Sequence, residues 1–413
     1  MIVIIDQSHY ITAAQKVGND LLKKVIWDGP RCNWVEASLN YNQAQTSIQV
    51  NNLGNDIYTG LSGILYFTTA LYAYTRDEMY KEIVCGIIEN LKRRYSNDKA
   101  SWSFYTSHIG ILYALYQASN LISDYETKEW VGLKLKELIH SPIINEEIEV
   151  LYGVSSAVEP LKILLEDYFP EDLISTLIKI GNHIIDKSIS EGNAVYWKPT
   201  ICDWGLSGLS HGAAGISNAL LSIYQITEDE KYLNYATKGI EFENQLFSPL
   251  VQNWLDKRNI HNNPSEESYA MAWCNGAPGI GLSRLRAWQI TQNEEWKEQG
   301  IKAMNKTSDY IYQSLNSPLE EVNFSLCHGV CGNAEILRQA DEIMNTKSFE
   351  RTIKDVADFG VYHFDAVGLD WPGGVLTPNT MKPLSTLSLM MGSTGIGLFY
   401  LKAANPSEVK IIL

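Results

Sequence analysis

A short step of two small residues separated by two others recurs seven times along the chain, and it constrains the fold more than any other feature. Five copies read Gly-x-x-Gly, and two replace one glycine by serine. The last positions of successive copies are 47, 46, 59, 64, 53 and 63 residues apart, a spacing that accommodates two helices and their loops per repeat. The copies begin at Gly60, Ser107, Gly153, Gly212, Gly276, Gly329 and Gly392.

Each step leads into a segment that is apolar nearly all round, such as residues 64–71, which indicates a helix buried on most sides. Segments with one charged face alternate with these, for example residues 78–94. Another amphipathic helix is predicted from Ile11 to Val25, before the first step. Seven buried and seven amphipathic helices predict an all-α, seven-fold (α/α) toroid with every step at one mouth. An open solenoid has the same local pattern and is the alternative.

The repeat is interrupted by no Pro/Gly/Ser-rich linker, so the sequence predicts a single domain over residues 1–413. A polar run from Asn40 to Asn52 is predicted to be a loop. Two further polar loops are predicted, one at residues 254–268 before the Cys274 motif and one at residues 364–383. Loops of this kind often shape a neighbouring site.

The net charge of −15 argues against a nucleic-acid partner, which would require basic patches. The N-terminus lacks the basic region of a signal peptide, and no apolar run reaches 18 residues, so no membrane span is predicted. Six cysteines are too sparse for a disulfide framework. We therefore expect a cytoplasmic protein whose thiols serve a metal or catalysis.

Metal-binding side chains occupy equivalent positions before two neighbouring steps. Cys274 and Cys327 lie two residues before their glycines, and His328 lies one residue before its glycine. In a closed ring these side chains share one space at the mouth. Two thiolates and one imidazole form a ligand set that zinc takes when a fourth position stays open for water or substrate. The sequence therefore predicts a Zn²⁺ site made by Cys274, Cys327 and His328.

His211 occupies the same position as His328, but Ser210 rather than a cysteine precedes it. An imidazole without a thiolate beside it suits proton transfer better than metal binding. Glu149 lies slightly upstream of the third step. The alternatives are a core or capping histidine for His211 and a surface carboxylate for Glu149. The other four cysteines are predicted to be small buried hydrophobes: Cys32, Cys85, Cys202 and Cys331.

These motifs resemble those of the lanthionine cyclase family, the LanC-like proteins. The resemblance rests on Ser-His-Gly-Ala-Ala-Gly at 210–215, Trp-Cys-Asn-Gly-Ala-Pro-Gly at 273–279 and Cys-His-Gly at 327–329, and it extends over nearly the whole chain. The motif sequences are most similar to those of the cyclase domain of bifunctional lanthipeptide synthetases. The family fold is a seven-fold (α/α) toroid with zinc held by two cysteines and one histidine, and these ligands fall on Cys274, Cys327 and His328.

The resemblance implies the addition of cysteine thiols to dehydroalanine or dehydrobutyrine in a dehydrated precursor peptide, which forms (methyl)lanthionine thioether rings. The family's acidic partner of the active-site histidine falls on Glu149. This correspondence implies that His211 and Glu149 form the catalytic acid/base pair. Because the chain has no room for a dehydratase, it is expected to be a free-standing cyclase or one excised from a larger protein, and a separate dehydratase is a candidate partner.

Two departures from the stand-alone peptide cyclases leave the substrate type open. Ala270 stands where they often carry arginine, and Asn275 stands where they often carry tyrosine. One alternative is a LanC-like protein that adds a small thiol such as glutathione to dehydroamino acids. Another is a non-catalytic zinc scaffold that binds peptides. A zinc hydrolase would favour histidine and carboxylate ligands, and a glycosidase would need paired carboxylates at the mouth.

Overall fold

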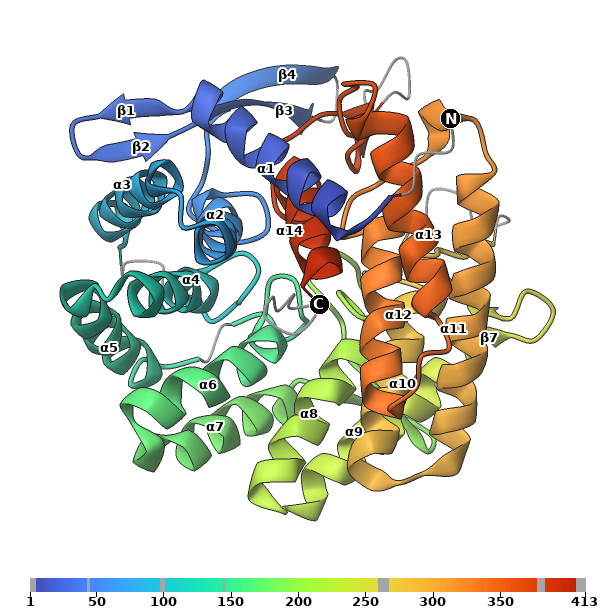
Figure 1. Ribbon diagram of the computed structural model, residues 1–413. Coiled ribbons are helices and arrows are strands. Elements are labelled where there is room, and N and C mark those ends of the chain that lie inside the picture. The colour runs from blue at the N-terminus through green and yellow to red at the C-terminus, as the bar shows by residue number, and fades with distance from the viewer. Residues whose placement is uncertain are drawn as a thin grey trace.

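The computed structural model describes residues 5–42, 45–96, 101–143, 146–258, 267–376 and 383–405. Its α-helices form two concentric layers around one axis (Figure 1). The inner layer consists of α2 (Leu61–Thr75), α4 (His108–Ile122), α6 (Val158–Tyr168), α8 (Ala213–Thr227), α10 (Ala277–Thr291), α12 (Val330–Met344) and α14 (Ser393–Ala404). The outer layer consists of α1 (Gln7–Lys24), α3 (Glu78–Arg94), α5 (Tyr125–Ile139), α7 (Leu173–Asp186), α9 (Glu230–Asn244), α11 (Glu294–Leu315) and α13 (Glu350–Gly360).

The ring is closed by the first helix of the chain. Helix α1 packs on α14, and α14 packs in turn on α2, so the last inner helix lies against the first (Figure 1). The predicted seven-fold toroid is therefore confirmed, and the open solenoid is excluded. Helix α1 is the outer partner of the seventh repeat. It begins before the predicted Ile11 because the Asp6 carboxylate caps it, accepting a hydrogen bond from the Ser8 amide at 3.0 Å.

Antiparallel hairpins extend from the connections, a feature that the helical repeat does not predict. They pair β1 (Ile26–Asp28) with β2 (Arg31–Asn33), β3 (Val35–Asn42) with β4 (Gln45–Asn52), β5 (Ile189–Glu191) with β6 (Ala194–Tyr196), β7 (Phe247–Ser248) with β8 (Asn253–Trp254), and β9 (Val375–Leu376) with β10 (Pro383–Leu384). The predicted loop at Asn40–Asn52 is wrong, because this run pairs from Val35 opposite Asn52 to Asn42 opposite Gln45. Its valine, tyrosine, threonine and isoleucine residues favour strands. Short helices at residues 154–157, 170–172, 319–321 and 361–365 complete the described elements.

The second residue of each step must be small because the first turn of the inner helix packs directly against a backbone carbonyl of the preceding loop. A Cβ on Gly110 would lie 1.8 Å from the Phe104 oxygen, and a Cβ on any of the other five glycines in this position would lie 1.8–2.4 Å from the equivalent carbonyl oxygen. Ser156 is the exception. Its hydroxyl accepts a hydrogen bond from the Phe104 amide at 2.9 Å, and the helix there starts as a 3₁₀ turn, η1 (Val154–Ala157), before α6.

A ring of hydrogen bonds joins the loops at the mouth. We define the mouth positions as the residues two before each step: Tyr58, Tyr105, Leu151, Ser210, Cys274, Cys327 and Met390. At five of the seven junctions, the amide of one mouth position donates to the carbonyl of the next. These bonds run from Tyr58 to Tyr105 (2.9 Å), Leu151 to Ser210 (3.2 Å), Ser210 to Cys274 (3.0 Å), Cys327 to Met390 (2.8 Å) and Met390 to Tyr58 (3.1 Å).

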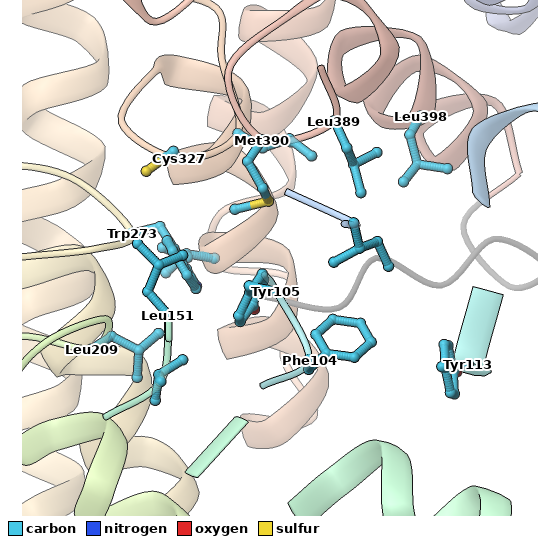
Figure 2. Packing of buried hydrophobic residues seen from close by; sticks show 14 of the residues in the cluster. Phe104, Tyr105, Tyr113, Leu151, Leu209, Trp273, Cys327, Leu389, Met390 and Leu398 are labelled. Atoms are coloured by element: carbon cyan, nitrogen blue, oxygen red, sulfur yellow. The ribbon is translucent and has the colours of Figure 1, made fainter. Parts of the chain in front are cut away.

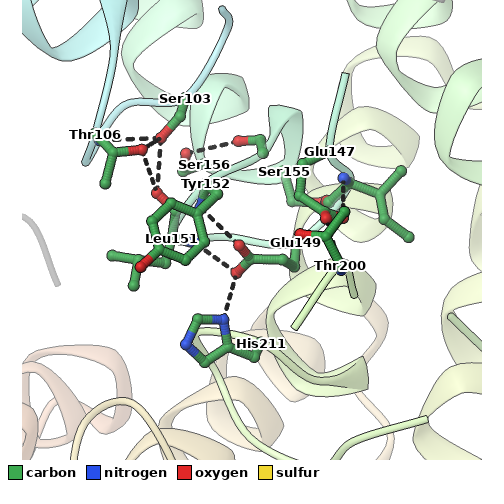
Figure 3. Close-up of polar contacts among 12 residues, drawn as sticks. Ser103, Thr106, Glu147, Glu149, Leu151, Tyr152, Ser155, Ser156, Thr200 and His211 are labelled. Atoms are coloured by element: carbon green, nitrogen blue, oxygen red, sulfur yellow. Dashed lines mark hydrogen bonds and ion pairs between the residues drawn. The ribbon is translucent and has the colours of Figure 1, made fainter. Parts of the chain in front are cut away.

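The two remaining junctions differ. Between the second and third repeats, the hydroxyls of Ser103 and Thr106 donate to the Leu151 carbonyl at 2.8 and 3.0 Å (Figure 3). Between Cys274 and Cys327, both of which lie in described segments, no such backbone bond forms. Their thiols meet instead. The backbone ring is therefore interrupted where the predicted metal ligands lie.

A layer of large apolar side chains closes the axis beneath the mouth (Figure 2). It is formed by the residues three before each step, all of them buried: Ile57, Phe104, Val150, Leu209, Trp273, Leu326 and Leu389. A cavity of about 530 Å³ lies on the far side of this layer, among the inner helices, and none of the predicted site residues lines it.

Among the helices of the described segments, none has the length and apolar character of a membrane span.

Candidate active site

Cys274 and Cys327 lie in contact at the mouth, each just before the start of an inner helix. The two thiols lie close enough to shift each other's pKa. Cys327 is 4% exposed, whereas Cys274 is only half-buried. The neighbouring loop fits against this pair through Gly208, whose φ of +110° favours glycine and whose added Cβ would lie 2.9 Å from the Cys274 oxygen. The loops therefore bring together the two predicted thiol ligands.

The two thiols differ in acidity. The hydrogen bond from Cys327 lowers the pKa of Cys274 to about 7, and the positive charges of Arg258 and His211 act in the same direction, while burial opposes them. The hydrogen bond to Cys274 and burial raise the pKa of Cys327 well above its usual range. Near neutral pH, the metal-free pair therefore holds one proton on Cys327 and places the thiolate on Cys274.

This asymmetry predicts selective alkylation. Because a thiolate forms as the pH rises through its pKa, iodoacetamide is expected to label Cys274 of the metal-free protein with a midpoint near pH 7, ahead of Cys327. Peptide mapping by mass spectrometry measures both rates. Arg258→Gln should move the midpoint upward, whereas Arg351→Gln, at a side chain 90% exposed on α13, should not. Equal labelling of both cysteines at every pH would contradict the assignment.

His328 is held at the mouth by a loop from the seventh repeat. Its Nε2 lies 2.7 Å from the Gly374 carbonyl oxygen. This contact fixes the orientation of the ring, and Nδ1 is the nitrogen that does not face the carbonyl. Only glycine fits at 374, because a Cβ there would lie 2.7 Å from the same Nε2. Burial lowers the pKa of His328 and favours the neutral imidazole. A backbone carbonyl on the second nitrogen and a neutral ring are both typical of a metal-binding histidine.

The donor chemistry of these residues fits zinc. Two thiols in contact and a neutral imidazole supply soft and borderline ligands. Across the described ranges, no group of three or more His, Cys, Asp or Glu side chains is arranged so that it could hold a metal ion. The structure thus joins Cys274 to Cys327 and orients His328 separately.

His211 and Glu149 form the second predicted pair. His211 Nδ1 lies 3.1 Å from Glu149 Oε2, although the residues are 62 positions apart (Figure 3). The carboxylate also accepts hydrogen bonds from the amides of Leu151 and Tyr152, each at 2.7 Å. Glu149 is only 1% exposed, so the alternative of a surface carboxylate is wrong. These contacts fix the histidine ring and direct Nε2 away from the carboxylate.

His211 belongs to the same mouth as the thiols. Its charge acts on Cys274, and the Ser210 amide before it donates to the Cys274 carbonyl at 3.0 Å. Tyr152 stacks on the imidazole, with ring centroids 5.9 Å apart and planes at 28° (Figure 3). The Tyr152 side chain is 46% exposed, so one face of the pair is open to solvent. The imidazole of His211 and the thiol pair therefore lie at the same mouth.

Sequence reasoning missed three contributors to this site. Tyr58 donates a hydrogen bond to Cys327 at 2.9 Å, and its place among the mouth positions was a usable signal. Arg258 comes from the predicted polar loop and is held by the Asp256 carboxylate, with Nη2 at 2.6 Å. The carbonyl of Gly374 comes from the other predicted loop. Neither loop carried a signal that pointed to these residues; Asn259–Ser265, also in the first loop, lie outside the described residues.

The remaining cysteines are unpaired, as are Cys274 and Cys327. Cys32 and Cys331 are buried as predicted. The prediction is wrong for Cys85, which is exposed on the outer helix α3, and Cys202 is only partly buried.

Comparison with known proteins agrees with the fold and the motifs. Residues 51–413 match the model of a family described as lanthionine synthetase C-like protein. The chain is 25% identical over 342 residues to the lacticin 481/lactococcin biosynthesis protein LcnDR2 of Lactococcus lactis subsp. lactis, covering 76% of this chain and 32% of that protein. It is 22% identical over 328 residues to the nisin biosynthesis protein NisC of the same organism, covering 72% of this chain and 76% of NisC.

The solved structure of nisin cyclase superimposes with a TM-score of 0.61 at 18% identity, over 86% of this chain and 90% of that one. At 18% identity, this structural similarity shows the fold alone, which is the helical toroid described above. The family match covers most of the sequence, so the chain belongs to the lanthionine synthetase C-like family. It spans about a third of the length of LcnDR2.

Proposed function

We propose that this protein is a zinc-dependent lanthipeptide cyclase. It adds cysteine thiols of a dehydrated precursor peptide to dehydroalanine or dehydrobutyrine and so forms (methyl)lanthionine rings. The observation that carries the proposal is the presence of the Cys274–Cys327 thiol pair and the His211–Glu149 pair on one open mouth. Family membership supports the same reaction. We further propose that residues 1–413 act as one cyclase domain and that a dehydratase supplies the substrate.

Cys274, Cys327 and His328 would hold the zinc ion. When bound, zinc would lower the pKa of a substrate thiol and favour its thiolate at neutral pH. The substrate sulfur bonds to the β-carbon of the dehydroamino acid, and the π electron pair moves toward the α-carbon and its carbonyl oxygen. His211 then delivers a proton from Nε2 to the α-carbon, while Glu149 stabilises the ring through Nδ1. The proton gained at the α-carbon balances the one lost by the thiol.

Arg258 supplies positive charge to this mouth. Stand-alone peptide cyclases often carry an arginine at the position of Ala270, and here Arg258 acts on Cys274 and Cys327 from the preceding loop. Its guanidinium is oriented by bonds from Nε to Asp256 at 3.0 and 3.1 Å. A cation at this place favours the enolate that develops during thiol addition.

The reaction is tested with a dehydrated precursor peptide and a thiol-alkylating reagent. Cyclisation removes free thiols without changing the peptide mass, so fewer alkyl groups should be counted by mass spectrometry after incubation. Added glutathione separates the main alternative, because a small-thiol transferase would raise the peptide mass by one glutathione per dehydroamino acid. No loss of thiols and no adduct would favour a peptide-binding scaffold.

One zinc per chain is expected in the purified protein, measured by elemental analysis. Cys274→Ala/Cys327→Ala should lose this zinc, because two of three proposed protein ligands are removed. The matched control is Cys85→Ala/Cys202→Ala, which changes two cysteines outside the mouth. Full occupancy in the Cys274→Ala/Cys327→Ala variant would refute the ligand assignment.

A further inference from the structure

Tyr58 is the mouth position of the first repeat, equivalent to Cys274 and Cys327 in the fifth and sixth. Its hydroxyl lies 2.9 Å from Cys327 Sγ and 3.5 Å from Met391 Sδ. A phenol donates one proton, and the shorter contact with the stronger acceptor is the one to Cys327. The hydroxyl therefore points at a proposed zinc ligand rather than into the core.

The backbone fixes this contact. The Tyr58 carbonyl accepts from the Met390 amide at 3.1 Å, and the Met390 carbonyl accepts from the Cys327 amide at 2.8 Å. On its other side, the Tyr58 amide donates to the Tyr105 carbonyl at 2.9 Å, and the two rings meet edge to face at 6.4 Å. Tyr58 and Cys327 are thus held by the same hydrogen-bonded ring, with only Met390 between them.

The contact distinguishes the two cysteines. Arg258 acts on both cysteines, but Cys327 also receives the hydrogen bond of the neutral Tyr58 hydroxyl. A hydroxyl that donates to sulfur draws electron density from it and restricts its position. The effect does not depend on the Cys327 proton, because a thiolate accepts the same bond.

We propose that Tyr58 is a positioning residue that holds the Cys327 sulfur in place through its O–H···S hydrogen bond and weakens that sulfur as an electron donor. This inference rests on the proposed function for its catalytic meaning. A cyclase brings a reactive dehydroamino acid close to its own cysteines. With Cys327 held and weakened by Tyr58, the substrate sulfur rather than Cys327 adds to the alkene.

The first test is a double-mutant cycle in the metal-free protein. Tyr58→Phe and Cys327→Ala remove opposite ends of one bond, so their effects on thermal unfolding should be less than additive. The matched cycle pairs Cys327→Ala with Tyr80→Phe, the same change at a buried tyrosine of the outer helix α3 whose hydroxyl contacts Asn19, and should be additive. Additive effects in the Tyr58 cycle would overturn the contact.

The second test uses Co²⁺ as a spectroscopic replacement for zinc. Tyr58→Phe is expected to weaken Co²⁺ binding about 10–100-fold, because Cys327 is no longer held in place. It should also shift the thiolate-to-cobalt charge-transfer band to lower energy, because the sulfur without its hydrogen bond is the stronger electron donor, whereas Tyr80→Phe should change neither. An unchanged affinity and band in Tyr58→Phe would overturn the positioning role. If the unmodified protein bound no Co²⁺, the zinc part of the proposed function would fail, and the metal-free cycle would still decide the Tyr58 contact.

Discussion

His211→Asn is expected to slow cyclisation by about 10²–10⁴-fold, the usual contribution of a general acid, while the protein keeps its fold and its zinc. Asparagine cannot deliver a proton near neutral pH, but it retains a polar group beside Glu149. The thiol pair lies on other loops and should remain intact. The substrate thiol should therefore still bind, and the defect should lie in kcat.

The measurement is single-turnover cyclisation of a dehydrated peptide, followed by alkylation and mass spectrometry, with zinc content determined on the same samples. His140→Asn is the matched control, because His140 is an exposed histidine at the end of α5. A His211→Asn protein without zinc would make His211 a ligand. A wild-type rate would assign His211 a structural role and leave the proton donor elsewhere.

The fold was predictable because one physical requirement repeats. Each inner helix must start on a carbonyl of its own loop, so a small residue recurs at a fixed place, as Gly110 and Gly332 show. The same register placed Cys274 and Cys327 in equivalent positions and thus predicted their contact. The seventh outer helix was harder to assign, because α1 lies at the opposite end of the sequence from α14.

The rest of the site depends on contacts that no local pattern encodes. Arg258 reaches the thiols from a loop outside the repeat, and Gly374 acts through a backbone carbonyl, which any residue type carries. Tyr58 differs, because it occupies a mouth position. A tyrosine there could belong to the core or to the site, and the 2.9 Å contact with Cys327 is the observation that distinguishes the two.

One buried ion pair connects the stability of the ring to the geometry of the mouth. Glu243 on α9 and Arg284 on α10 are both fully buried, with Oε2 and Nη2 2.8 Å apart. The other carboxylate oxygen accepts from the Gly208 amide at 2.8 Å, in the loop that leads to Ser210 and His211. Arg284 Nε also donates to Gln299 at 3.0 Å. The pair thus joins the fourth and fifth repeats directly behind the site.

Glu243→Ala is expected to lower the free energy of unfolding by about 3–5 kcal/mol, because it leaves the Arg284 charge buried without its carboxylate. That is a large part of the roughly 5–15 kcal/mol that stabilises a typical protein. Urea denaturation followed by circular dichroism measures the change.

Glu243→Leu/Arg284→Met should cost less stability than Glu243→Ala, since removing both charges leaves no unpaired ion. Asp20→Ala, which breaks the exposed Lys24–Asp20 pair, should cost less than about 1 kcal/mol. If Glu243→Ala were no more destabilising than Asp20→Ala, the buried pair would not hold these repeats together, and the mouth would owe its geometry to the hydrogen-bonded ring alone.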